Sequence, residues 1–160
     1  MTMNKSRRAA AQDGIDWLRA STQRSLLVLA RCHAMPPEVA CYAVELLPDI
    51  AKKGGFVWLD TGDLQHGDEL RLEQARSAPL VIVDGLHAPL GPHAVDCAGW
   101  LLEHRHHAGL RSIVSTCLAP DEIGRWLEAQ GYLAVASLIG RLHDAPTSLV
   151  VDVLAPRLAA

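Results

Sequence analysis

Hydrophobic residues gather in short continuous runs, and longer segments with helical spacing separate these runs. The runs have the length of strands and are SLLVLA (25–30), FVWLDT (56–61), APLVIVDG (78–85), RSIVSTC (111–117) and TSLVVDVL (147–154). The first run has no polar alternation, which is typical of a parallel strand that helices cover on both faces. The pattern therefore predicts five strands in a buried sheet.

Apolar residues three and four positions apart predict helices between these strands. The predicted helices cover residues 12–23, 38–53, 92–107 and 119–131, with a polar loop and a helix over 62–76 and a short helix near 136–142. Pro48 is expected to kink or end the second helix. Alternating strands and helices imply right-handed crossovers, so we expect an α/β fold, a three-layer sandwich around a five-stranded parallel sheet.

Length and charge restrict the organisation and the partners. The 160 residues fit one domain, and we expect a flexible basic N-terminal arm over 1–11 followed by a single α/β domain over 12–160. A net charge of -3 provides no general attraction to nucleic acid or to anionic membranes, so weak or no nucleic-acid binding is expected. No apolar run reaches the roughly 18 residues that span a bilayer, and the N-terminus is polar, which indicates a cytoplasmic protein without membrane contact.

The four cysteines are widely spaced and form no C-x-x-C pair. They are Cys32, Cys41, Cys97 and Cys117. In a reducing compartment this spacing favours free thiols over disulfides or a zinc site.

The eight residues after the first strand, ARCHAMPP (30–37), occupy the slot of a phosphate-binding loop, whose pattern is G-x-x-x-x-G-K-[ST]. Ala30 and Met35 stand where the two glycines would be. Pro36 replaces the lysine and Pro37 the hydroxyl residue. Proline has no N–H to bind phosphate, no cation for the outer phosphates and no hydroxyl for magnesium, although it starts a helix well.

The ends of the third and fourth strands carry polar residues. In LVIVDGLH (80–87) the hydrophobic strand ends in Asp84, which is followed by Gly85. The fourth strand ends in Thr116 and Cys117. Ligands of parallel α/β sheets bind at these carboxyl ends, so the residues there are the candidates for a site.

In this order of elements, residues 12–154 resemble the AAA+ ATPase core of bacterial helicase loaders of the DnaC kind and of the related IstB transposition ATPases. The resemblance implies a P-loop NTPase fold, here without the small helical lid domain after the fifth strand. It also implies that Asp84 stands at the metal-associated Walker B position, that Gly85 replaces the catalytic glutamate, and that Thr116 stands at a polar sensor position. No carboxylate is then placed to orient the attacking water.

A further match lies in LIGRLHDAP (138–146), which resembles the stretch in which loaders carry an arginine that reaches a neighbouring subunit's nucleotide. Arg141 matches that arginine, and Gly140 replaces the acid before it. An alternative is that Arg141 pairs with Asp144 or with a helix terminus.

The sequence thus indicates a non-hydrolysing relative of these ATPases, with no cofactor, that acts as a protein-interaction or regulatory module. The expected partner is a replication, transposition or other ATPase, or a second copy of the chain. The alternative is a small enzyme in the crevice of the sheet. It would use Cys117 with His87, because a thiolate beside an imidazolium is a nucleophile, or a metal held by the strand-end acids.

Other candidate groups have structural explanations. The acids Asp60, Asp63 and Asp84 could form a metal site at the strand ends or cap the following helices. His104 and His107 lie three apart on a predicted helix and could hold a metal or complement the helix dipole. A Cys32–His33 nucleophile is disfavoured because adjacent residues rarely converge on one substrate.

Overall fold

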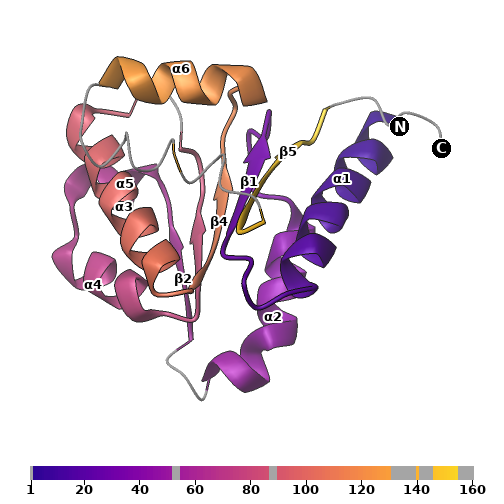
Figure 1. Cartoon of the computed structure of the whole chain (residues 1–160), viewed down its shortest axis with the longest axis horizontal. Coiled ribbons are helices and arrows are strands. Elements are labelled where there is room, and N and C mark those ends of the chain that lie inside the picture. Colours follow the sequence, from indigo (N-terminus) through magenta and orange to yellow (C-terminus); the bar gives the residue numbers. More distant parts are fainter. Residues whose placement is uncertain (1, 52–54, 87–89, 131–139, 141–145, 155–160) are drawn as a thin grey trace.

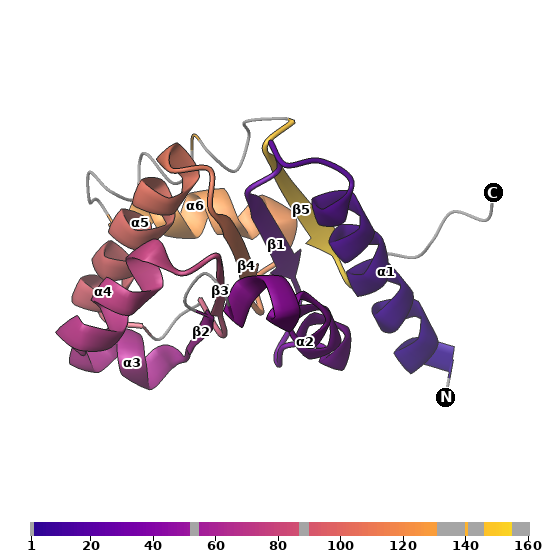
Figure 2. The ribbon, with the colours of Figure 1, turned by 90° about the horizontal axis from the view of Figure 1, so that it is seen from below.

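A computed structural model describes residues 2–51, 55–86, 90–130, 140 and 146–154, and five parallel strands form its central sheet. Figure 1 shows α1 and α2 on one side of the sheet and α5 and α6 on the other, with α3 and α4 beside α5. The view in Figure 2, turned by 90°, shows the same three layers. The predicted α/β class and parallel five-stranded sheet are therefore confirmed.

The strands pair in the order β2-β3-β4-β1-β5, so β1 lies between β4 and β5. The strands are β1 (Leu26–Ala30), β2 (Phe56–Leu59), β3 (Leu80–Val83), β4 (Arg111–Ser115) and β5 (Ser148–Asp152). The helices are α1 (Thr2–Arg19), α2 (Pro37–Ala51), α3 (Thr61–His66), α4 (Glu69–Ser77), α5 (Pro92–His107) and α6 (Pro120–Gln130). This order brings the loop after β1 next to the ends of β4 and β5.

Alternate residues of the buried strands pack into two separate cores. Leu27 and Leu29 of β1 pack with α1 and α2, whereas Leu26 and Val28 pack with α5 and α6. All five residues of β1 are buried. The unbroken apolar run in the sequence thus reflects burial on both faces of the sheet.

The N-terminal helix is longer than the sequence pattern predicted. The stretch predicted as a flexible arm is helical from Thr2, and α1 buries Ala11, Ile15 and Leu18. Three consecutive alanines and the absence of proline and glycine before Gly14 favour this extension. Basic residues are as compatible with the exposed face of a helix as with the predicted flexible arm.

Several element boundaries also differ from the predicted ones. β2, β3 and β4 each end at least two residues before the predicted end, because the polar residues that follow enter loops and caps. The segment 62–76 contains two helices, α3 and α4. Pro48 lies within α2, which continues to Ala51. The short helix predicted near 136–142 lies outside the described residues apart from position 140.

A buried arginine joins α5 to the sheet and to the end of α4. Arg105 has no exposed surface, and its Nε donates to Ser112 Oγ at 3.0 Å. Its guanidinium nitrogens donate to the carbonyls of Ala75 at 2.6 Å, Ala78 at 2.7 Å and Arg111 at 2.5 Å. Burial lowers the pKa of Arg105 to about 10. Because these acceptors are neutral, hydrogen bonds rather than an ion pair compensate the buried charge.

Among the described residues, no helix is both long and apolar enough to cross a lipid bilayer.

We predict that Arg105→Ala lowers the free energy of unfolding by roughly 3–5 kcal/mol, because it leaves buried carbonyls without donors and opens a cavity. Arg105→Lys should fall between wild type and alanine, since an ammonium cannot match the planar set of donors. Urea denaturation followed by circular dichroism measures these changes.

The matched control for this prediction is Arg76→Ala on α4, because Arg76 is exposed and pairs with Glu73 at 3.0 Å, an interaction worth less than about 1 kcal/mol. Similar losses for the Arg105 and Arg76 variants would show that Arg105 is not an anchor of the fold.

Candidate functional site

The loop between β1 and α2, the predicted P-loop slot, is tied to the end of β4 by its first backbone amides. The N–H of Arg31 donates to the carbonyl of Leu118 at 2.9 Å, and the N–H of Cys32 donates to the carbonyl of Thr116 at 2.8 Å. A phosphate-binding loop instead directs such amides toward the ligand. Two donors of this loop are therefore already engaged within the protein.

The prolines of the loop start α2, as the sequence predicted. Pro37 is the first residue of the helix, and the carbonyl of Pro36 accepts from the N–H of Val39 at 3.0 Å. Neither proline has an N–H, so two further donors are missing where a helix N-terminus would bind an anion. Met35 is half-buried and packs against the core that α1 and α2 share with the sheet.

A carboxylate belonging to the chain lies at this helix N-terminus. Glu38, in the first turn of α2, forms an ion pair with Arg8 of α1, with Arg8 Nε 3.5 Å from Glu38 Oε1. The other oxygen, Oε2, is buried and has no hydrogen-bond partner among the described residues. The positive end of the helix dipole favours a negative group here. The presence of Glu38 makes the same position unfavourable for phosphate, because like charges repel.

Arg31 holds the loop against β5. Its backbone φ of 51° is in the left-handed region, which residues other than glycine rarely adopt. Its Nε donates to Asp152 Oδ1 at 2.7 Å, and a second guanidinium nitrogen contacts Asp152 Oδ2. The hydrogen bond to Asp152 raises the pKa of Arg31. This bidentate pair and the bond to Leu118 together hold Arg31 in its uncommon conformation.

A cleft of about 290 Å³ lies beside the loop, lined by residues 31–38 together with Arg7, Arg8 and Val153. Of its three arginines, Arg8 pairs with Glu38 and Arg31 with Asp152. The cleft is therefore basic in composition, but acids of the same chain neutralise much of its charge.

The acid predicted at the Walker B position has a partner that the sequence analysis missed. Ser115, the last residue of β4, donates from its hydroxyl to Asp84 Oδ1 at 2.7 Å. The N–H of Gly85 donates to Ser115 Oγ at 2.9 Å. Gly85 has a φ of 92°, which only glycine adopts readily. The Asp84 carboxylate is thus held by β4 at the carboxyl edge of the sheet.

Thr116, the predicted sensor residue, is buried and forms hydrogen bonds with the backbone around the β1–α2 loop. It is 2% exposed, and its N–H donates to the carbonyl of Leu29 at 3.0 Å. Its hydroxyl accepts from the N–H of Leu118 at 3.3 Å. The alternation of side chains along the chain brings Ser115 rather than Thr116 to Asp84. The sensor role of Thr116 stays a prediction.

The proposed Cys117–His87 pair is not established by the structure. Cys117 is half-buried at the end of β4, and His87 lies outside the described residues. Arg141 also lies outside them. The roles proposed for Cys117, His87 and Arg141 therefore stay predictions.

The strand-end acids Asp60 and Asp63 cap α3 rather than converge on Asp84. Asp60 Oδ1 accepts from the N–H of Asp63 at 3.0 Å, and Asp63 Oδ2 accepts from the N–H of Asp60 at 3.0 Å. Asp63 also pairs with Arg71 at 3.3 Å. This reciprocal capping box accounts for the presence of both acids at the start of α3. Within the described part of the chain, no group of three His, Cys, Asp or Glu side chains could hold a metal.

Cys32 does not have the properties of a nucleophile. Its side chain is 5% exposed, and its Sγ donates to the carbonyl of Ala34 at 3.0 Å. Burial raises the pKa of Cys32 to about 11, so little thiolate is present at neutral pH. All four cysteines are free thiols.

The fold, but not the sequence, is similar to that of a solved protein. No family model matches the chain, and no curated protein matches it either. The crystal structure of DnaI superposes with a TM-score of 0.62 at 13% identity, over 91% of this chain and 85% of that chain. The five-stranded parallel α/β architecture is therefore similar to the fold of DnaI. At this identity the likeness extends to the fold alone.

We predict that alkylation at pH 8 modifies exposed Cys41 fastest and Cys32 slowest. The raised pKa of Cys32, about 11 against an ordinary 9.0, reduces its thiolate fraction roughly 100-fold, and burial slows the reaction further. The rate at Cys32 should therefore increase as the pH rises toward 11. Iodoacetamide labelling followed by peptide mass mapping measures each rate, with Cys41→Ser to identify the fast site. Labelling of Cys117 well above the rate of Cys41 would contradict this order and would favour the enzyme alternative.

Proposed function

We propose that this protein is a non-hydrolysing relative of P-loop ATPases, with a fold of the DnaI type that has become a protein-interaction or regulatory module. The proposal has two parts. The first is that the β1–α2 loop does not bind a nucleoside triphosphate, and the second is that the chain acts through another protein.

The loop geometry is the observation that supports the first part most strongly. Four backbone donors are removed from the site, two by hydrogen bonds of Arg31 and Cys32 to carbonyls just after β4 and two by the prolines at 36 and 37. The lysine and hydroxyl positions carry no polar side chain. The Glu38 carboxylate adds a negative charge at the helix N-terminus. Each change opposes a different contribution to triphosphate binding.

The residues at the end of β3 support the proposed absence of nucleotide hydrolysis. Asp84 is the acid that could hold magnesium through a water, and its Oδ1 already accepts from Ser115. Gly85 follows it, so no carboxylate stands next to it to orient a water for attack on a phosphate. Even a nucleotide bound by other contacts would therefore lack a catalytic group at this position.

The partner in this proposal is an ATPase of a replication or transposition complex, or a second copy of this chain. The support is the resemblance to helicase loaders and IstB-like ATPases together with the DnaI-like fold. A subunit that binds no nucleotide can still contribute a side chain to a partner's nucleotide site, and Arg141 is the candidate for that contact. A net charge of -3 argues for a protein partner rather than nucleic acid.

We predict no saturable binding of Mg·ATP below about 1 mM, since the remaining contacts cannot supply the roughly 4 kcal/mol that this affinity represents. Isothermal titration calorimetry with the full chain measures binding, and a phosphate-release assay measures turnover. Dissociation constants in the micromolar range would contradict the proposal.

The double variant Pro36→Lys, Pro37→Thr is measured in the same experiment for comparison with the wild-type chain. It restores the cation and the hydroxyl while the Glu38 charge and the tied amides of Arg31 and Cys32 remain. We expect it to bind Mg·ATP far more weakly than an intact P-loop protein. Tight binding by the double variant would show that the side chains alone, and not the loop backbone, account for the loss.

A further inference from the structure

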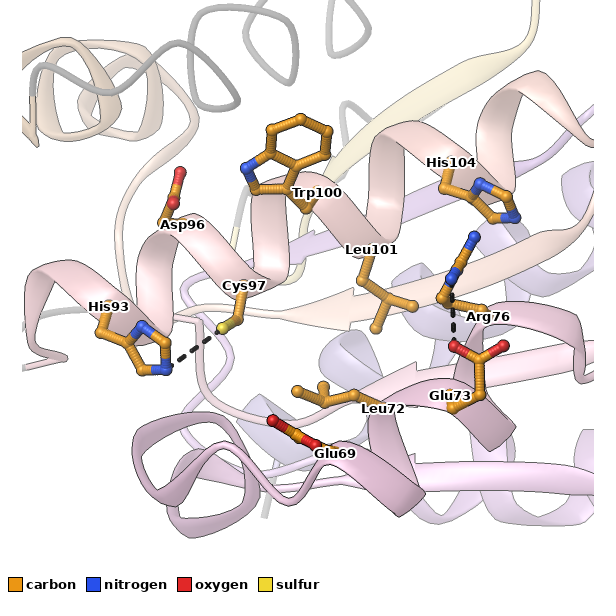
Figure 3. Close-up of a pocket in the computed structure, with 10 residues that line it drawn as sticks. All are labelled: Glu69, Leu72, Glu73, Arg76, His93, Asp96, Cys97, Trp100, Leu101 and His104. Carbon is orange, nitrogen blue, oxygen red and sulfur yellow. Dashed lines mark hydrogen bonds and ion pairs between the residues drawn. The ribbon is translucent and has the colours of Figure 1, made fainter.

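A second cleft, with a volume of about 780 Å³, lies between α4 and α5 (Figure 3). Its apolar lining includes Leu72 of α4 together with Trp100 and Leu101 of α5. Leu101 belongs to the buried core, whereas Trp100 is 64% exposed. A large exposed aromatic residue beside an apolar cleft is typical of a surface that binds another molecule.

The rest of the chain covers little of α4. Of its nine residues, all of them described, only Ala75 is buried. Helices in folded proteins are stabilised mainly by packing an apolar face against a neighbour. The outward side of α4 is therefore available to pack against a further element.

The residues that line the cleft form one stripe along each helix. The α5 residues of this stripe recur every three or four positions and are His93, Cys97, Trp100 and His104. The α4 residues have the same spacing and are Glu69, Leu72, Glu73 and Arg76. At a rise of 1.5 Å per residue the α5 stripe runs for roughly 16 Å, about three helical turns. Two neighbouring stripes of this kind form a groove whose shape suits a third helix.

The charge of the cleft favours one kind of occupant. Three carboxylates line it, those of Glu69, Glu73 and Asp96, against one guanidinium, that of Arg76. Arg76 pairs with Glu73 at 3.0 Å, whereas Glu69 and Asp96 form no ion pair among the described residues. The excess of carboxylates repels nucleic acid and anionic lipid, and it opposes a symmetric dimer in which two copies of the cleft face each other. A basic protein segment complements this charge.

We propose that the α4–α5 cleft binds an amphipathic helix of a partner protein. The apolar stripe of that helix packs on Leu72, Trp100 and Leu101, and its basic side chains meet Glu69 and Asp96. This inference rests on the proposed role as a protein-interaction module and names the surface and the chemistry of the partner segment. Trp100 contributes most of the affinity, because tryptophan is enriched among the residues that dominate interfaces. The acids contribute mainly to the rate and specificity of association.

The test uses the full-length chain and a fluorescein-labelled helical peptide of about 18 residues, long enough to form a helix. This peptide carries leucines at positions i, i+3, i+4 and i+7 and lysines on its other face. One comparison peptide keeps the leucines and replaces lysine with glutamate, and a second has the leucine–lysine composition in scrambled order. Fluorescence anisotropy measures binding. We expect saturable binding of the leucine–lysine peptide and at least about tenfold weaker binding of both comparison peptides.

Two variants of the cleft test the contribution of each group. Trp100→Ala should weaken binding of the leucine–lysine peptide by more than about tenfold. The double variant Glu69→Lys, Asp96→Lys should weaken binding of the same peptide and strengthen binding of the glutamate peptide. Trp100 is exposed, so its truncation leaves the core intact, and circular dichroism checks the fold of both variants.

Matched controls lie on other helices. Val44→Ala removes an exposed apolar side chain from α2, and Asp121→Lys, Glu128→Lys makes the same change in net charge on α6. Both controls should bind the leucine–lysine peptide as the wild type does. An equal loss in the α6 double variant, or equal binding of the scrambled peptide, would show only a general attraction of charge and would overturn the proposal.

Two further outcomes would also overturn it. Wild-type affinity of Trp100→Ala would show that the peptide binds elsewhere. Concentration-dependent dimers in light scattering that Trp100→Ala abolishes would identify a second copy of the chain as the occupant. The peptide titration reports on the cleft and the Mg·ATP titration on the β1–α2 loop, so a failure of this inference is distinguished from a failure of the proposed function.

Discussion

The attachment of the β1–α2 loop to the end of β4 is the constraint on which the nucleotide-site geometry depends. The amides of Arg31 and Cys32 donate to carbonyls of residues 116 and 118, which pulls the chain toward the sheet before α2 begins. In a parallel α/β sheet this edge is where ligands bind, and backbone amides there are the natural anion donors. Here the protein itself accepts those hydrogen bonds, which supports the proposal that this loop does not bind a triphosphate.

Ion pairs within the chain reinforce the same arrangement. Arg31 binds Asp152 at the end of β5, and Arg8 binds Glu38 at the start of α2. Two of the three arginines that line the cleft, Arg8 and Arg31, thus meet carboxylates of the chain. The individual pairs are partly exposed, so each contributes little stability, and their main effect is on the local charge that a ligand would meet.

The order of strands and helices could be predicted from the sequence because burial on both faces produces unbroken apolar runs, as in residues 25–30. The predicted role of Pro37 at the start of α2 also holds. Residue-level contacts could not be predicted, because they depend on the register between strands distant in sequence. To predict that Asp84 pairs with Ser115, one must know which face of the sheet each residue at the end of β4 points to. To predict that Arg105 is buried, one must know which side of α5 packs on the sheet.

Amide hydrogen exchange at Arg31 and Cys32, measured by NMR with and without Mg·ATP, tests the central claim most directly. If the carbonyls of Thr116 and Leu118, just after β4, hold these amides, both should exchange slowly in the free protein and at the same rate when Mg·ATP is added. Fast exchange in the free protein, or protection that appears only with Mg·ATP, would show that the loop amides are available to phosphate and would contradict the account.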